Sequence, residues 1–242
     1  MSIEVKSVAV FGATGGIGSA FVSYYQNDAK VEKVYAFSRK KKASLHPKTT
    51  TIDLDIFNED KLKQNAEVIK KKQSLSLIII CTGFLHNENM RPEKSITQCH
   101  TQHLLESFKI NSIAPLLIAK HFLPVLDNKQ ASVLASLSAR VGSISDNRLG
   151  GWYGYRASKA ALNMYLKTLS IECKVRYPHA QIIGLHPGTV DSELSKPYTS
   201  STPKEKLFSA HDCVSKLAKV IREVSPSQSG SCLAWDGSTI AF

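Results

Sequence analysis

The stretch VAVFGATGGIGSAFV, which spans residues 8–22, decides the fold of this chain. Its first four residues form an uninterrupted apolar run, which is typical of a strand buried on both faces of a parallel sheet. A glycine-rich segment follows at once, and the residues from Ser19 onward have the pattern of a helix start. A strand, a glycine turn and a helix in this order are the context in which such a motif predicts a dinucleotide site.

The glycines of this turn have separate tasks in such a site. Gly12 allows the tight turn, Gly16 lets the backbone approach a pyrophosphate, and Gly18 lets helix and strand pack closely. The free N–H groups of the first helical turn then face the phosphates. An ordinary glycine-rich loop is the alternative. The expected coenzyme contacts in this segment are Gly12, Thr14, Gly15, Gly16, Ile17 and Gly18.

Short apolar runs alternate with helical patterns along the whole chain. The expected strands are residues 6–11, 33–37, 49–53, 75–81, 131–136, 180–186 and 231–235, and the expected helices are residues 16–26, 58–72, 97–123, 152–176 and 210–223. Alternation of this kind predicts right-handed βαβ units, and so an α/β fold: a doubly wound, Rossmann-like parallel sheet with helices on both faces. We expect a single domain over residues 1–242, because a chain of this length can bury a full core. A long loop at about 187–206 is a candidate lid.

Composition excludes several classes of protein. Hydrophobic residues make up 43% of the chain, which argues against disorder. No apolar run reaches the roughly 18 residues of a membrane span, and the N-terminus has no signal-peptide pattern, so we expect a cytoplasmic protein without a membrane partner. The five cysteines form no C-x-x-C pair, which favours reduced thiols. The eight histidines lack ligand spacing, so no metal site is expected.

The net charge of +11 raises the question of nucleic-acid binding. The positive runs at 39–42 and 70–72 each lie at the end of an expected element and not along one continuous face. No RNA- or DNA-binding module is visible in the sequence. We therefore expect no nucleic-acid partner.

Tyr155 and Lys159 are the strongest candidates for chemistry. They lie four residues apart and so share one face of a helix. A positive charge beside a phenol favours the phenolate, which predicts a lowered pKa for Tyr155 and a role in moving a proton. The alternative is a helix face with one buried ring and one solvated amine.

The residues after the second expected strand bear on the choice of coenzyme. Ser38 lies twenty residues after Gly18, where an acidic residue would hold the ribose hydroxyls of NAD. Arg39 follows, and its guanidinium can bind a 2′-phosphate through two parallel hydrogen bonds. The sequence therefore predicts NADP, with NAD less favoured; a solvated run of charge is the alternative.

These features occur together in one known family. The glycine turn, Asn111, the Tyr155/Lys159 pair and residues 187–189 have the order and the distances of the short-chain dehydrogenases/reductases, which the chain resembles from about residue 5 to about residue 240. Residues 136–142, 150–163 and 235–237 are similar to the branch that holds C-factor-like and sniffer-type carbonyl reductases.

The resemblance implies roles for single residues. Tyr155 matches the catalytic acid/base, and Lys159 matches the lysine that lowers the tyrosine pKa and binds the nicotinamide ribose. Ser138 matches the serine that orients the substrate carbonyl, and Asn111 matches the asparagine of a proton relay through water. The further coenzyme contacts that the resemblance implies are Asp55 beside the adenine, Gly83 after the fourth strand, and Pro187, Gly188 and Thr189 at the nicotinamide carboxamide.

Two departures concern the coenzyme segments. Phe11 stands where the family usually has threonine at the start of the glycine motif. The N-A-G segment of the family reads Cys81-Thr82-Gly83 here, so that the asparagine contact is missing and the hydroxyl of Thr82 could partly replace it.

The position of the serine is open. Counting back from Gly142 without a gap puts Ala139 at the family position, whereas Ser138 offers a hydroxyl one residue away. We choose Ser138, with Ser136 and Ser143 as alternatives.

Four of the implied roles also have a local alternative. The alternatives are a local hydrogen bond for Asn111, a helix cap for Asp55, a turn for Thr189 and a bond within its own loop for Ser138.

The predicted activity is reversible hydride transfer between NADP(H) and a small-molecule carbonyl/alcohol pair, with Tyr155 as the acid/base. Candidate pocket walls are mostly apolar and suggest a hydrophobic ketone or aldehyde: Phe84, Leu85, Leu149, Trp152 and residues 190–206. The alternatives are a non-catalytic NADP(H) sensor or signalling protein and a ketoacyl-thioester reductase. The resemblance further implies a homodimer or homotetramer that pairs through the helices at 97–123 and 152–176.

Overall fold

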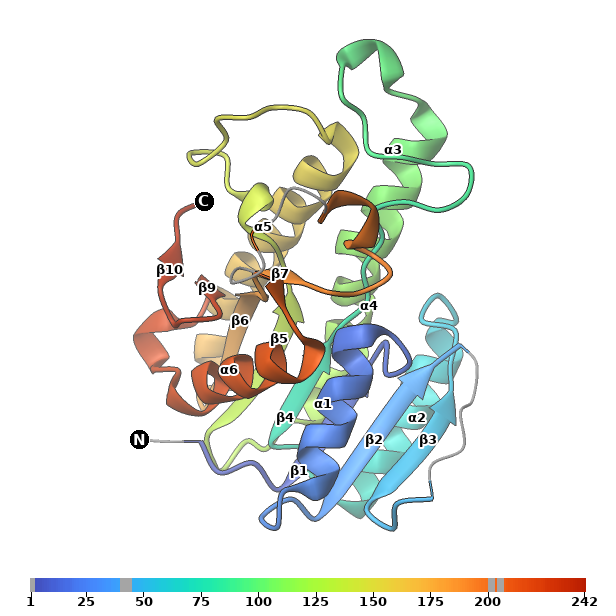
Figure 1. The fold of residues 1–242 in the computed structure, drawn as a ribbon. Helices are drawn as coiled ribbons and strands as arrows, with labels where there is room; N and C mark the ends of the chain where they lie inside the picture. The colour runs from blue at the N-terminus through green and yellow to red at the C-terminus, as the bar shows by residue number, and fades with distance from the viewer. Residues whose placement is uncertain (1–2, 40–44, 200–202, 204–206) are drawn as a thin grey trace.

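A single eight-stranded sheet forms the centre of the molecule (Figure 1). The computed structural model describes residues 3–39, 45–199, 203 and 207–242. The strand order is β10-β9-β6-β5-β4-β1-β2-β3, and every neighbouring pair is parallel except β9 and β10. The predicted α/β class and doubly wound parallel sheet are confirmed.

The helices and strands have the following bounds. The strands are β1 (Ser7–Phe11), β2 (Lys33–Ser38), β3 (Thr49–Asp53), β4 (Leu77–Ile80), β5 (Ser132–Leu137), β6 (Ala180–His186), β7 (Thr189–Val190), β8 (Leu207–Phe208), β9 (Cys232–Ala234) and β10 (Thr239–Ile240). The helices are α1 (Gly16–Asn27), α2 (Glu59–Lys72), α3 (Thr101–Phe108), α4 (Ala114–Phe122), α5 (Tyr153–Arg176) and α6 (Ala210–Glu223). Short helical turns include η2 (Lys109–Ile113), η4 (Arg140–Gly142) and η5 (Lys196–Tyr198).

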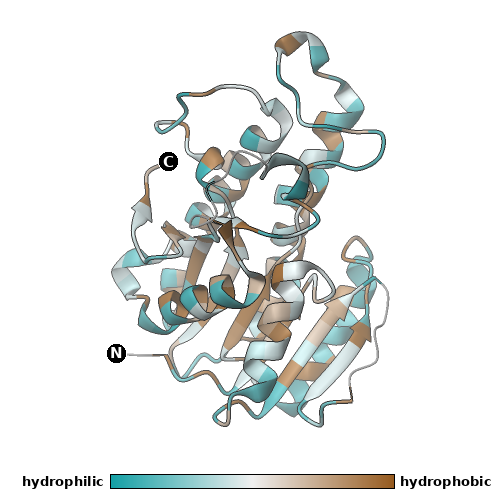
Figure 2. Cartoon of the chain, viewed as in Figure 1, coloured by the Kyte–Doolittle hydropathy of each residue, from teal (hydrophilic) through white to brown (hydrophobic). Residues whose placement is uncertain are grey.

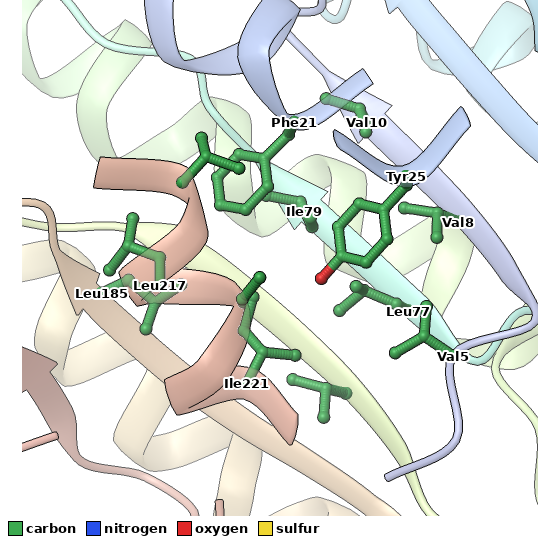
Figure 3. Packing of buried hydrophobic residues seen from close by; sticks show 14 of the residues in the cluster. Val5, Val8, Val10, Phe21, Tyr25, Leu77, Ile79, Leu185, Leu217 and Ile221 are labelled. Atoms are coloured by element: carbon green, nitrogen blue, oxygen red, sulfur yellow. The ribbon is translucent and has the colours of Figure 1, made fainter. Parts of the chain in front are cut away.

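Helices cover both faces of the sheet. In Figure 1, α1 and α6 lie in front of the strands and α2, α4 and α5 lie behind them. On the front face, Phe21 and Tyr25 of α1 lie among Leu217 and Ile221 of α6 and the side chains of β1 and β4 (Figure 3). Burial of this apolar surface is the main stabilising contribution to the fold.

A cluster of aromatic rings stabilises the rear face. The Phe11 ring stacks on Phe37 with 4.4 Å between ring centroids, and its edge contacts Phe122 of α4 at 4.8 Å. Such pairs stabilise a core by about 0.5–1.5 kcal/mol each beyond their area. Phe11, the residue that departs from the family's usual threonine, is therefore part of the core.

Hydropathy follows this layered arrangement. Brown, apolar residues run along the strands, and teal, polar residues cover much of the outer helix surfaces (Figure 2). Within the described residues, no helix combines the length and apolar character that crossing a membrane requires.

One expected helix is interrupted. The helix predicted at 97–123 is divided into α3 and α4 by the π turn η2. Pro115 lies at the start of α4 and has no N–H to donate to the carbonyl of Asn111, four residues earlier. The π turn accommodates this missing bond, and the sequence analysis did not predict it. The strands β7, β8 and β10 were also missed, because each has only two residues.

Candidate functional site

The glycine turn lies at the point where the chain order of the sheet reverses. From β1 the chain continues to β2 and β3 on one side, whereas β4, β5 and β6 extend the other side. The N–H groups of Gly12 and Ala13 both donate to the carbonyl oxygen of Phe37 at 3.0 Å, so the turn lies against the end of β2. Ligands of open α/β sheets bind at this kind of switch point.

Two of the glycines cannot be replaced without moving the backbone. Gly12 has a φ of +77°, and a β-carbon on it would lie 3.1 Å from the carbonyl carbon of Cys81. A β-carbon on Gly18 would lie 2.1 Å from the carbonyl oxygen of Gly12. The predicted roles of these glycines in the tight turn and in the close approach of helix and strand agree with this geometry.

The segment around the turn offers donors that suit a dinucleotide phosphate. The residue before α1 is Gly15, and no side chain caps the first N–H groups of the helix. Next to the turn, the buried Thr82 Oγ1 has no hydrogen-bond partner among the described residues. Exposed helical N–H groups and a buried hydroxyl without a partner fit a bound pyrophosphate and its sugar.

The end of β2 presents the residues proposed for coenzyme choice. Ser38 is half-buried as the last residue of β2, and Arg39 is exposed directly after it. The rest of the basic run, residues 40–42, lies outside the described residues.

Asp55 does not cap the helix that follows it. Its carboxylate accepts a hydrogen bond from the N–H of Phe57, within a turn, and is exposed. The cap of α2 is Asn58, whose side chain accepts from the N–H of Lys61. The alternative of a capping role for Asp55 is therefore wrong, and its place beside an adenine stays a prediction.

A pocket of about 230 Å³ opens at the carboxyl ends of the strands. Segments that are far apart in the sequence form its wall: Ile17 of α1, Leu85 after β4, residues 138–141 after β5, Trp152 and Tyr155 at the start of α5, and residues 186–190 at the end of β6. The structure thus brings Ile17, Ser138, Tyr155, Pro187, Gly188 and Thr189 together around one cavity.

Tyr155 and Lys159 project from the first turns of α5. Tyr155 is half-buried, and Lys159 is buried with its Nζ donating to the carbonyl oxygen of Leu137 at 2.8 Å. The Lys159 Nζ lies 5.8 Å from the centroid of the Tyr155 ring. The helical spacing predicted from the sequence therefore places both groups on one face.

The pKa of Tyr155 differs from the expectation. Burial raises the pKa of Tyr155 to about 12 and lowers the pKa of Lys159 to about 8. The predicted lowering of the tyrosine pKa is wrong for the protein alone, because loss of solvation outweighs the attraction of an amine at this distance. At neutral pH the phenol keeps its proton.

Ser138 is the best placed of the three candidate serines. It lines the pocket, whereas Ser136 and Ser143 are buried outside the pocket wall. Its Oγ donates to Oδ1 of Asn163 on α5 at 2.7 Å, so the alternative of a bond within its own loop is wrong. Ala139, the position found by gapless counting, also lines the pocket.

Asn111 forms bonds to distant segments and not to its own helix. Its Oδ1 accepts from the N–H of Phe84 at 2.7 Å, and its Nδ2 donates to the carbonyl oxygen of Phe84 at 2.8 Å and to Oγ of Ser158 at 3.0 Å. The side chain thus attaches the loop after β4 to α5. The relay role that the resemblance implies for Asn111 stays a prediction.

Several pocket residues were missed or misplaced from the sequence. Among the expected walls, Leu149 is 92% exposed and Phe84 lies outside this pocket. The pocket residue His186 was not predicted. Asn163, which binds Ser138 from outside the pocket wall, was not predicted either, although it follows Lys159 by four residues and therefore shares its helix face. From the long loop, Leu194 and Tyr198 reach the pocket; residues 200–202 and 204–206 of that loop lie outside the described residues.

A metal site has no support in the described ranges. No group of three or more His, Cys, Asp or Glu side chains there could hold an ion. His100 and His103 stand close together, with 5.4 Å between ring centroids, but without a third ligand in the described part of the chain.

One family model matches most of the chain, and a curated protein matches more than half of it. The family model described as short chain dehydrogenase matches residues 6–203. C-signal of Myxococcus xanthus is 30% identical over 140 residues, which cover 57% of this chain and 78% of that protein.

Solved structures share the fold over nearly the whole chain. The NADPH-bound carbonyl reductase from chicken fatty liver matches with a TM-score of 0.85 and 27% identity, covering 99% of this chain and 95% of its own. The carbonyl reductase Sniffer of D. melanogaster matches with a TM-score of 0.86 and 23% identity, covering 98% of this chain and 100% of its own.

Proposed function

Because the chain belongs to the short-chain dehydrogenase family, we propose that it is an NADP(H)-dependent oxidoreductase that interconverts a carbonyl and an alcohol, with Tyr155 as the acid/base. As a member of this family, the chain is an oxidoreductase. The proposal treats residues 1–242 as one catalytic domain, and the cytoplasmic location expected from the sequence stays a prediction.

The observation that carries the proposal is the pocket at the carboxyl ends of the strands. It combines a protonated phenol on Tyr155, a buried hydroxyl on Ser138 and the start of α1, beside the glycine turn. A carbonyl compound in a cavity of about 230 Å³ would have a proton donor and a hydrogen-bond donor within the same wall. A coenzyme that spans the glycine turn and residues 187–189 would lie along that wall.

Tyr155 is suited to act as an acid. When bound, the nicotinamide coenzyme supplies the hydride for reduction or accepts it for oxidation. Since its pKa is about 12, the Tyr155 hydroxyl holds a proton at neutral pH and can donate it to the substrate oxygen as charge develops there. Lys159, with a pKa of about 8, remains largely positive at neutral pH and would bind the nicotinamide ribose.

In this mechanism Ser138 donates a hydrogen bond to the substrate oxygen. This requires a different orientation of the Asn163 side-chain amide. The Asn163 Oδ1 now accepts the Ser138 proton, while the Asn163 Nδ2 is buried without a partner among the described residues. Rotating the amide by half a turn gives Nδ2 the Ser138 oxygen as a partner and releases the hydroxyl proton toward the pocket. A donor of this kind contributes about 2–4 kcal/mol to stabilising the developing charge.

The preference for NADP rests on charge. Arg39 is exposed at the end of β2, and no acidic residue stands at the position of Ser38 to repel a 2′-phosphate. The chicken carbonyl reductase, 27% identical to this chain, was solved with NADPH bound. Titration with both coenzymes should give the tighter dissociation constant for NADPH.

The substrate and the assembly follow from the pocket and the family. Leu85, Val141 and Leu194 make much of the wall apolar, which favours a hydrophobic ketone or aldehyde. We further propose a homodimer or homotetramer, because the resemblance implies pairing through the helices now seen as α3 to α5.

The Tyr155→Phe variant tests the catalytic assignment. We expect it to lower the turnover of a panel of carbonyl compounds with NADPH by at least about 100-fold, because the proton donor is lost. The dissociation constant for NADPH should change little, since the ring remains. Absorbance at 340 nm measures the first quantity, and a fluorescence titration measures the second.

Tyr165→Phe is the matched control. Tyr165 lies on the same helix but outside the pocket, so this variant should keep wild-type rates. A Tyr155→Phe variant with wild-type turnover would refute the role of Tyr155. Binding of NADPH without turnover of any panel member would favour the sensor, and turnover of acyl-carrier thioesters alone would favour the ketoacyl-thioester reductase.

A further inference from the structure

The backbone at the start of α5 has an unusual conformation. Trp152 has φ 52° and ψ 44°, and it is the one non-glycine residue with a positive φ among the described residues. The two residues before it, Gly150 and Gly151, have φ values of 63° and 64°. Glycine adopts this region freely, whereas a residue with a β-carbon and a bulky ring does so at a cost in stability.

Contacts with Glu93 hold Trp152 in this conformation. The backbone N–H of Trp152 donates to the carbonyl oxygen of Glu93. The carboxylate of Glu93, which is buried, accepts a hydrogen bond from the N–H of Gly154 at 3.1 Å. The Trp152 carbonyl in turn accepts from Arg156 in the first turn of α5. Hydrogen bonds at the N–H and at the carbonyl oxygen of Trp152 therefore fix its backbone conformation.

Local structure does not explain why this residue is a tryptophan. Trp152 occupies the N-cap position of α5 and makes no side-chain hydrogen bond to the helix. Gly, Asn, Asp or Ser would fit both the cap and the left-handed backbone better. A residue held in an unfavourable conformation beside a ligand pocket points to a function for its side chain.

The ring of Trp152 faces the pocket. Its edge or face contacts the Tyr198 ring at 5.2 Å between centroids and the Tyr155 ring at 6.1 Å, with interplanar angles of 66° and 73°. All three residues line the cavity. A planar apolar group bound here would meet two aromatic side chains while its polar end reaches Tyr155.

We propose that Trp152 is a specificity-determining residue that selects aryl ketones and aryl aldehydes over alkyl carbonyl compounds of equal size. This inference rests on the proposed function, because the reacting carbonyl must lie at Tyr155. An aryl group can form the edge-to-face contacts that aromatic rings favour, and a saturated ring of the same carbon skeleton cannot. The Trp152 ring lies 6.1 Å from the Tyr155 ring, so that contact would lie beside the reacting carbon.

The test compares acetophenone with cyclohexyl methyl ketone, which share a skeleton and differ in the planarity of the ring. We expect the wild type to favour acetophenone in kcat/KM by about five- to tenfold, mainly through KM. Trp152→Ala and Trp152→Gly should remove this preference, and Trp152→Phe should keep most of it. Tyr153→Ala, at the exposed neighbouring residue, is the control and should leave it unchanged. Equal losses on both ketones, or an unchanged preference, would overturn the inference.

A stability measurement separates the backbone from the ring. Trp152→Gly and Trp152→Ala remove the same ring contacts, but only glycine lacks the β-carbon that opposes a positive φ. Thermal unfolding should therefore give a higher Tm for Trp152→Gly than for Trp152→Ala, by about 2–4 °C. A Tm for the glycine variant equal to or below that of the alanine variant contradicts the unfavourable backbone.

A binding measurement keeps this inference distinct from the proposed function. The chain has two tryptophans, so Trp235→Phe leaves Trp152 as the single tryptophan reporter. With saturating NADP⁺, which cannot reduce a ketone, acetophenone should quench the fluorescence saturably and cyclohexyl methyl ketone should not. A wild type that reduces no member of the carbonyl panel but shows this selective quenching refutes the reductase and keeps the aryl site. Turnover of both ketones without selective quenching refutes the aryl site alone.

Discussion

The Ser138 hydroxyl donates to Oδ1 of Asn163, whose amide can act as donor or acceptor, and it also interacts with the Cys232 thiol. The distance of 2.7 Å between Ser138 Oγ and Asn163 Oδ1 suits either orientation, since oxygen and nitrogen can exchange places. The orientation decides whether Ser138 can donate to a substrate. Asn163 is thus a positioning residue that acts through Ser138.

The Asn163→Asp variant tests this coupling. A carboxylate can only accept a hydrogen bond, so it should retain the Ser138 proton and lower kcat by about 10- to 100-fold, with a smaller effect on KM. In the Ser138→Ala background the same change should have almost no further effect on kcat. Steady-state kinetics of the wild type, the two single variants and the double variant give the coupling between Asn163 and Ser138. Additive losses of kcat in the double variant would show that Asn163 does not act through Ser138.

The buried Lys159 makes the folded protein more stable as the pH rises above about 8. Its pKa is about 8 in the folded protein and about 10.4 in an unfolded chain. Between these values the unfolded chain binds more protons, so the free energy of unfolding rises with pH, by up to about 1.4 kcal/mol per unit. Below pH 8 the cost of burying the ammonium is fully present.

The comparison of wild type with Lys159→Met tests this effect, although the variant also removes a charge that lowers the pKa of the Cys232 thiol. Denaturant titrations between pH 7 and pH 10 should show the wild type gaining stability relative to the variant above pH 8. A constant difference across this range would mean that the folded-state pKa of Lys159 is not lowered. Tyr155 does not interfere within this window, because its raised pKa alters stability only above the ordinary tyrosine value near 10.

At the scale of elements, the strand β1 and the helix α1 approach so closely that only glycine fits between them. A methyl group on Gly18 would lie 2.1 Å from the carbonyl oxygen of Gly12, which is backbone and cannot rotate away. A methyl group on Gly15 would lie 3.5 Å from the same oxygen, an ordinary contact. Alanine substitutions at these two positions therefore distinguish the packing of helix against strand from the binding of a ligand.

Gly18→Ala should lower the free energy of unfolding by about 3 kcal/mol or more, since helix and strand must move apart. Gly15→Ala should cost about 1 kcal/mol or less as a poorer cap, but should weaken NADPH binding at the helix N-terminus. Urea unfolding and coenzyme titration measure the two effects. Equal stability of the two variants would be inconsistent with the close approach at Gly18.

At the scale of the whole molecule, helices α3 and α5 leave apolar side chains exposed. Met164, Ile171 and Val175 of α5 are 64%, 57% and 85% exposed, and Leu105 of α3 is 60% exposed. Their spacing on α5 puts the three side chains along one stripe of the helix. A second copy of the chain is the partner that the resemblance implies for this surface.

Ile171→Glu should convert the proposed homodimer or homotetramer into a smaller assembly, because a charge would be buried in the apolar contact. Val68→Glu on α2 is the matched control, since Val68 is 52% exposed on another helix. Light scattering after gel filtration gives the mass of each form. A wild type of about 27 kDa, or a loss of mass in the control as well, would contradict this interface.

The family and most of the elements could be predicted before folding was considered. The predicted family is confirmed by the short chain dehydrogenase family model, which matches residues 6–203. Each of the seven expected strands corresponds to a strand, because the apolar or β-branched residues that favour a strand are a local property of the chain. The π turn at Asn111 was not predicted, and a proline four residues later was its signal.

Local pattern was enough for the glycine turn and for the Tyr155/Lys159 face, because the geometry of a turn and of a helix depends on near neighbours. The choice of Ser138 over Ser136 and Ser143, its bond to Asn163 and the raised pKa of Tyr155 come from burial and from contacts between segments far apart in the chain. The meeting of Trp152 with Tyr198 is of the same kind. Such properties depend on solvent exclusion and on three-dimensional distance, and neither is a function of spacing along the sequence.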